Sequence, residues 1–167
     1  MIYVTGIEVK EAHRCFEAGT KFAFKDLNLL VGEQGCGKST LLSGLQNHAD
    51  WLEYQLTEQC KNEGVPTFYF DSEKMNPGIV DTRYYGLAEQ DKFKQALISR
   101  FRSHGETLVD YTVNLLPKAE NCLVFIDEPE SGLSLRNQFR LIQSIEKALK
   151  NKCQIFIATH CFVLISH

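Results

Sequence analysis

The stretch Gly32-Glu-Gln-Gly-Cys-Gly-Lys-Ser39 matches the pattern GxxxxGK[ST], which joins a strand to a helix. The apolar run 27–31 comes directly before it and suits a strand that is buried on both faces of a parallel sheet. The leucine-rich segment that starts at Thr40 has broadly helical spacing. Glycines let a loop wrap closely around an anion, and the N-terminus of the following helix faces that anion. The sequence therefore predicts a phosphate-binding loop.

Each polar residue of this loop has a chemical role in the prediction. Lys38 is placed to reach the β- and γ-phosphates of a nucleotide, and the Ser39 hydroxyl to ligate Mg²⁺. The loop N–H groups and the first turn of the helix would hold the phosphate oxygens. The predicted nucleotide-contacting set is Gly32, Gly35, Cys36, Gly37, Lys38, Ser39 and Thr40.

A second motif, Cys122-Leu-Val-Phe-Ile-Asp-Glu-Pro129, is an apolar strand that ends in two acidic residues. Asp127 is expected at the carboxyl end of the sheet, where ligands bind in α/β folds, and is the second predicted Mg²⁺ ligand. Glu128 follows it and could accept a proton from an attacking water molecule. An acidic turn after a core strand is the alternative, which the phosphate loop upstream disfavours.

The rest of the chain alternates between apolar runs and amphipathic stretches. Strands are predicted at residues 2–9, 21–25, 27–31, 66–70, 122–126 and 154–158. Helices are predicted at residues 40–59, with a break near 47–50, and at 88–102, 108–116 and 135–149. Such alternation is typical of an α/β fold with a mostly parallel sheet. We expect one domain over residues 1–167, which is either minimal or truncated after residue 167.

The segment Ile126-Asp-Glu-Pro-Glu-Ser-Gly-Leu-Ser134 resembles the Walker B motif and D-loop of ABC ATPases, and Ile157-Ala-Thr-His160 resembles their switch-histidine motif. The stretch LNLLVGEQGCGKSTLL at residues 27–42 is similar to the opening of stand-alone ABC ATPases and SMC/RecF-like proteins. The resemblance implies a P-loop NTPase fold of the ABC type, with ATP as the nucleotide. It further implies that Asp127 is associated with Mg²⁺, that Glu128 is catalytic, and that His160 senses the γ-phosphate. Residues 131–134 would form the D-loop of a head-to-tail, ATP-dependent homodimer.

The ABC signature is matched less closely, by Arg102-Ser-His-Gly-Glu-Thr107 within an expected helical lobe at about residues 78–120. Ser103 suits a helix N-cap, and Gly105 permits close approach of a phosphate. By resemblance, Ser103, Gly105 and Glu106 would contact ATP bound to the other subunit. The alternative is an ordinary helix cap.

Other positions depart from the family pattern. Ser134 ends the D-loop where many members have Asp, and no Q-loop glutamine is assigned. Asp71 and Glu73 occupy about the Q-loop region and could approach the metal or a partner, or belong to a solvated loop. Phe16 and Phe22 are candidates for stacking on adenine.

The composition is that of an ordinary globular protein, with 44% apolar and 23% charged residues. The net charge of -3 provides no global basic field, which leaves nucleic-acid binding open but not indicated. The six cysteines form no CxxC pair, and no signal peptide or transmembrane-length run is present. A reducing cytoplasm fits these features best.

We predict an ATP-hydrolysing switch that acts on an unidentified protein partner or effector. Resemblance suggests DNA maintenance or defence of bacteria against phage. One alternative is an ATP-gated interaction module with little turnover. Another is the nucleotide-binding subunit of a transporter, against which the short lobe and the SHGET sequence argue. An SMC-type clamp is disfavoured because residues 39–103 lack sustained heptads.

Overall fold

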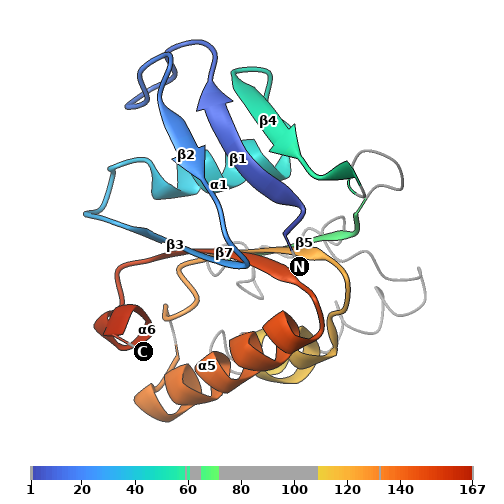
Figure 1. Cartoon of the computed structure of the whole chain (residues 1–167). Helices are drawn as coiled ribbons and strands as arrows, with labels where there is room; N and C mark the ends of the chain where they lie inside the picture. Colours follow the sequence, from blue (N-terminus) through green and yellow to red (C-terminus); the bar gives the residue numbers. More distant parts are fainter. Residues whose placement is uncertain (1, 59, 61–64, 72–108, 132, 167) are drawn as a thin grey trace, which may run out of the picture.

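In the computed structural model, the described part of the chain contains two β-sheets with helices beside them (Figure 1). The structure describes residues 2–58, 60, 65–71, 109–131 and 133–166. The predicted helix at 88–102 and most of the lobe at 78–120 lie outside these ranges.

The larger sheet is parallel and has the strand order β3-β7-β6-β5. Its strands are β3 (Leu27–Val31), β7 (Gln154–Thr159), β6 (Leu123–Asp127) and β5 (Thr67–Asp71). Each one overlaps a strand predicted from an apolar run. Because all four strands point the same way, their carboxyl ends meet at one edge of the sheet.

Helices cover both faces of this sheet (Figure 1). Leu123 and Phe125 of β6 pack in one hydrophobic cluster with α1 (Lys38–Gln46). Val124 and Ile126 pack in the other cluster with α5 (Leu135–Lys150). Successive side chains of a strand alternate between faces, so burial on both sides explains why β6 and β7 are apolar nearly throughout.

The second sheet is antiparallel, with the order β2-β1-β4, and contains β1 (Val4–Val9), β2 (Lys21–Ala23) and β4 (Leu52–Leu56). The prediction of a helix through residue 59 was wrong, because α1 ends at Gln46 and β4 pairs with β1. Leu52, Tyr54 and Leu56 alternate with polar residues, which is the pattern of a strand. The Tyr54 hydroxyl donates to Gly44 O over 2.7 Å, and burial raises its pKa to about 12.

One buried side chain joins the two sheets. Gln154, at the start of β7, has no exposed surface. Its amide group accepts from the N–H groups of Tyr3 and Val4, both over 2.9 Å, and donates to Val4 O and Lys25 O over 2.8 and 2.9 Å. These bonds satisfy backbone groups that would otherwise be buried without partners.

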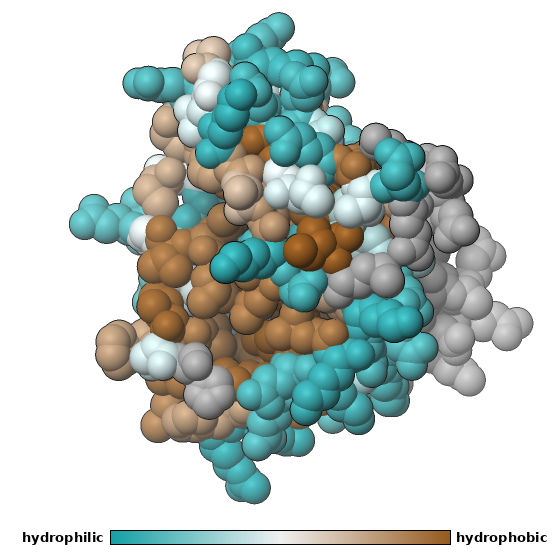
Figure 2. Space-filling view, in the orientation of Figure 1, coloured by the Kyte–Doolittle hydropathy of each residue, from teal (hydrophilic) through white to brown (hydrophobic). Residues whose placement is uncertain are grey.

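Shorter helical segments complete the described part: the π-helical turn η2 (Asp110–Leu115), the 3₁₀ turn η3 (Leu116–Lys118) and α6 (Phe162–Ser166). Figure 2 shows apolar surface on the face where Figure 1 places β3, α5 and α6. Exposed large apolar side chains of the chain include Val31, Leu135, Phe139, Phe162 and Ile165. Among the described residues, no helix has the length and apolar character to cross a membrane.

Candidate functional site

A pocket of about 590 Å³ lies at the carboxyl edge of the parallel sheet. The loop after β3 and the start of α1 form one side of it, and the ends of β5 and β6 form the other. Its lining is Arg14, Cys15, Gln34, Gly35, Gly37, Lys38, Ser39, Thr40, Ser43, Tyr69, Asp71, Asp127 and Glu128. Cationic side chains thus come from the loop side, and carboxylates from the ends of the strands.

Two glycines give the loop its shape. Gly35 and Gly37 have φ angles of 81° and 101°, in the left-handed region that side chains disfavour. A Cβ atom on Gly37 would also collide with Cys15 Sγ. Gly37 precedes the first residue of α1, and the first turn of α1 holds no acidic residue. The positive end of the helix is therefore left for an anion.

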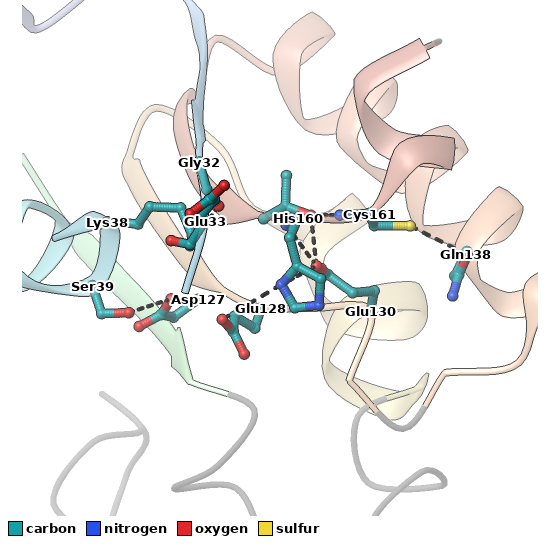
Figure 3. A network of polar contacts seen from close by, with 11 residues as sticks. Gly32, Glu33, Lys38, Ser39, Asp127, Glu128, Glu130, Gln138, His160 and Cys161 are labelled. Atoms are coloured by element: carbon teal, nitrogen blue, oxygen red, sulfur yellow. Dashed lines mark hydrogen bonds and ion pairs between the residues drawn. The ribbon is translucent and has the colours of Figure 1, made fainter. Parts of the chain in front are cut away.

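Lys38 and Ser39 extend from the first turn of α1 (Figure 3). The Lys38 ammonium group donates to Gly32 O and Glu33 O, both over 3.0 Å, and the residue is only 8% exposed. The Ser39 hydroxyl donates to Asp127 Oδ1 over 3.1 Å. The loop lysine is thus held against its own loop, while Ser39 and Asp127 meet across the pocket.

The donor set at Ser39 and Asp127 fits Mg²⁺. Both residues line one pocket and offer oxygen atoms as metal ligands. The second carboxylate oxygen of Asp127, Oδ2, accepts a hydrogen bond from the Tyr69 hydroxyl at 3.5 Å. Mg²⁺ prefers oxygen ligands, and in phosphate sites it uses one or two protein groups together with substrate phosphates and water. Within the described ranges, no group of three or more His, Cys, Asp or Glu side chains could hold a metal ion by itself.

His160 lies between two carboxylates that follow β6 (Figure 3). Its Nδ1 atom is 3.6 Å from Oε1 of Glu128 and 3.6 Å from Oε1 of Glu130. Glu128 has a φ of 46°, which is uncommon for a residue with a side chain, and its N–H donates to Ala158 O over 2.9 Å. Backbone strain of this kind clusters at functional sites.

The structure brings most of the predicted site residues together. Gly35, Gly37, Lys38, Ser39, Thr40, Asp127 and Glu128 line one pocket. Gly32 and Cys36 are not among its lining residues, although the Gly32 carbonyl holds Lys38. His160 reaches the pocket only through Glu128. Ser103, Gly105 and Glu106 lie outside the described residues, as does Glu73.

The aromatic candidates for adenine stacking lie beside the loop. The Phe16 ring is close to Gly37 and meets the Phe22 ring edge to face, with centroids 6.1 Å apart. It also stacks on Trp51, with centroids 5.8 Å apart. Adenine stacking by Phe16 or Phe22 stays a prediction.

Three residues near the site were not predicted from the sequence. Arg14 lines the pocket with a φ of 53°, and its Nη1 donates to Thr40 Oγ1 over 3.0 Å. Tyr69 reaches Asp127, and Glu130 reaches the residues after β7. Their roles depend on neighbours far away in the sequence. The only local signal was the acidic run DEPE, in which Glu130 was not assigned a role.

Comparison with known protein families finds a match over part of the chain. Residues 111–166 match the sequence model of a family described as "AAA domain, putative AbiEii toxin, Type IV TA system". The sequence matches no curated protein.

Several solved structures resemble the chain in fold. A "Putative ABC transporter (ATP-binding protein)" from Pyrococcus furiosus aligns with a TM-score of 0.57 and 14% identity, over 93% of this chain and 92% of that one. An ATP-binding subunit of an ABC transporter aligns with a TM-score of 0.55 and 17% identity, over 97% and 80%. A dimeric ATP-binding cassette in a post-hydrolysis state, bound to ADP and phosphate, aligns with a TM-score of 0.51 and 14% identity, over 96% and 88%. These alignments confirm the predicted fold class, an α/β fold with a parallel central sheet and flanking helices that resembles the ATP-binding subunits of ABC transporters.

Proposed function

We propose that the chain binds ATP with Mg²⁺ in this pocket and hydrolyses it, and that two copies associate head to tail around the nucleotide. The observation that carries the proposal is the meeting of the phosphate loop with the acidic end of β6, where Ser39 contacts Asp127 over 3.1 Å. Glu128 lines the same pocket, and His160 Nδ1 lies 3.6 Å from the Glu128 carboxylate.

The residues of the pocket divide the chemistry among them. Lys38 exchanges its two carbonyl acceptors, Gly32 O and Glu33 O, for oxygens of the β- and γ-phosphates. Ser39 and Asp127 hold Mg²⁺, which neutralises phosphate charge when bound. The start of α1 supplies N–H groups to the same phosphates.

Glu128 acts on water rather than on the nucleotide. Its carboxylate lines the pocket next to Asp127 and accepts a proton as water oxygen attacks the γ-phosphorus. The bond from that phosphorus to the β–γ bridging oxygen breaks, which yields ADP and phosphate. His160 contacts the γ-phosphate and distinguishes ATP from ADP.

The proposed dimer is supported by the family resemblance and by the dimeric form of a cassette with similar fold. In the proposed arrangement, each copy completes the other's site with residues 103–106, which lie outside the described residues. Opening after hydrolysis makes the pair a switch for a protein partner. The family description of residues 111–166 names a toxin of a toxin–antitoxin system, which supports a role in defence.

The Glu128→Gln variant is expected to form a dimer in Mg²⁺-ATP that persists, because the variant binds ATP and does not hydrolyse it. Size exclusion with light scattering should give twice the chain mass of 19.0 kDa with Mg²⁺-ATP and the single mass with Mg²⁺-ADP. The Glu53→Gln variant, altered at an exposed position of β4, is the control and should dimerise only transiently. A single mass under saturating ATP would refute the dimer.

A further inference from the structure

Glu130 is a buried carboxylate that links two strands. It follows β6 within a turn that is closed by a bond from Ser131 N–H to Glu128 O over 3.0 Å. Its side chain is 8% exposed, and Oε1 accepts from the Thr159 hydroxyl over 2.7 Å and from the His160 N–H over 3.0 Å. A buried charge is costly unless hydrogen bonds compensate it, and these two bonds stabilise one oxygen of the carboxylate.

The carboxylate is only partly satisfied. Its Oε2 atom is buried and has no hydrogen-bond partner among the described residues. His160 Nδ1 lies 3.6 Å from Oε1, which is longer than a hydrogen bond but within ion-pair range. A small rotation of the imidazole would bring its N–H onto this carboxylate.

Hydrogen-bond chemistry then assigns the two ring nitrogens. A carboxylate only accepts, so Nδ1 must carry a proton when it bonds Glu130. Nε2 is left for the pocket, and an anionic phosphate oxygen also only accepts. A histidine that bridges Glu130 and a γ-phosphate therefore donates from both nitrogens.

We infer that Glu130 is a positioning residue that holds Nδ1 of His160 and thereby keeps Glu128 available to activate water. Glu128 is equally close to Nδ1, at 3.6 Å, but its side chain is more exposed, at 30%, and lines the pocket. Glu130 faces away from solvent and competes with Glu128 for the same ring nitrogen. The effect on hydrolysis rests on the proposed function, whereas the orientation of the ring does not.

The Glu130→Gln substitution separates charge from structure. An amide oxygen can still accept from the Thr159 hydroxyl and the His160 N–H, so the link between the turn and β7 is kept. The negative charge that competes for Nδ1 is lost. The Glu120→Gln variant, which removes an exposed carboxylate, is the matched control.

We expect Glu130→Gln to lower kcat roughly tenfold, as the loss of a partner that orients a functional histidine does. The Kd for Mg²⁺-ATP should not change. In the His160→Ala background the same substitution should have no further effect on kcat, since neighbouring residues that act together are not additive. Equal losses of kcat in both backgrounds, or no loss in either, would overturn the inference.

A second measurement does not depend on hydrolysis. Nitrogen-15 NMR of the five histidine side chains, with His160 identified by its loss in His160→Ala, reports which ring nitrogen carries the proton. The proton is expected on Nδ1 in the wild type and also in Glu128→Gln, where Glu130 is the one of these two carboxylates that is left. It is expected partly on Nε2 in the Glu128→Gln/Glu130→Gln double variant, in which neither carboxylate accepts from Nδ1. A wild-type ring protonated on Nε2 alone would refute the orientation. If the wild-type proton is found on Nδ1 but no ATP is hydrolysed, the proposed function fails and the orientation of His160 stands.

Discussion

Replacement of Glu128 by glutamine is expected to lower the rate of ATP hydrolysis by roughly 10² to 10⁴-fold, the usual contribution of a positioned general base. Glutamine has almost the same shape but cannot take the proton of the attacking water. The affinity for Mg²⁺-ATP should be retained, because Lys38, Ser39 and the loop backbone supply the contacts to the phosphates. Phosphate release under saturating ATP measures the first effect, and fluorescent-nucleotide binding measures the second.

The position of Glu128 explains why this effect should be confined to turnover. Its side chain lines the pocket, but its backbone is held in the left-handed region by the bond to Ala158 O, which glutamine preserves. The control is Glu53→Gln, which removes a carboxylate from the exposed side of β4. Turnover of Glu128→Gln close to that of the wild type would assign the base to another residue.

Replacement of Lys38 by methionine is expected to weaken ATP binding by roughly 10- to 100-fold, as charge-assisted hydrogen bonds to phosphate are lost. Methionine has an unbranched side chain of similar length, so it fills the space of the buried alkyl part of Lys38 and removes only the charged ammonium group. Titration with a fluorescent ATP analogue gives the Kd, and Lys150→Met, in the last turn of α5, is the control.

Lys38 also has a role without nucleotide, which the same experiment must separate. Its ammonium group bonds Gly32 O and Glu33 O, so the methionine variant leaves both carbonyls without that donor. The melting temperature without ATP measures this loss of stability. An unchanged Kd for ATP would contradict the placement of the phosphates against this loop.

The strands that build the pocket were predictable because their signals are local. The runs 27–31, 122–126 and 154–158 are apolar nearly throughout, as buried parallel strands must be. The carboxyl ends of these strands then place the glycine loop, Asp127 and His160 on one edge. The apolar runs and the glycine pattern thus predicted the α/β fold class and the positions of Lys38, Ser39 and Asp127, whereas the role of His160 came from the family resemblance.

Strand β4 was missed for a tertiary reason. Leu52, Tyr54 and Leu56 follow a leucine-rich helix, and their alternation is short enough to read as its continuation. Pairing with β1 and the bond from Tyr54 to Gly44 O decide the conformation instead. Such contacts override local preference and have no signature within a short window.

The unpredicted site residues share the same cause. Arg14 meets Thr40 across 26 positions, and Glu130 meets His160 across 30. Neither partner pair forms a recognisable motif, because the fold, not the spacing, brings them together. Buried carboxylates beside conspicuous acidic motifs are therefore better found in the structure.

The most direct test of the account is the release of phosphate from ATP by the purified chain, measured with Mg²⁺ over a range of protein concentrations. We predict Mg²⁺-dependent hydrolysis whose rate per chain rises with concentration as dimers form, and which is roughly 10² to 10⁴-fold slower in Glu128→Gln. Tight binding of ATP without phosphate release at any concentration would contradict hydrolysis at this pocket and leave the chain a nucleotide-binding module.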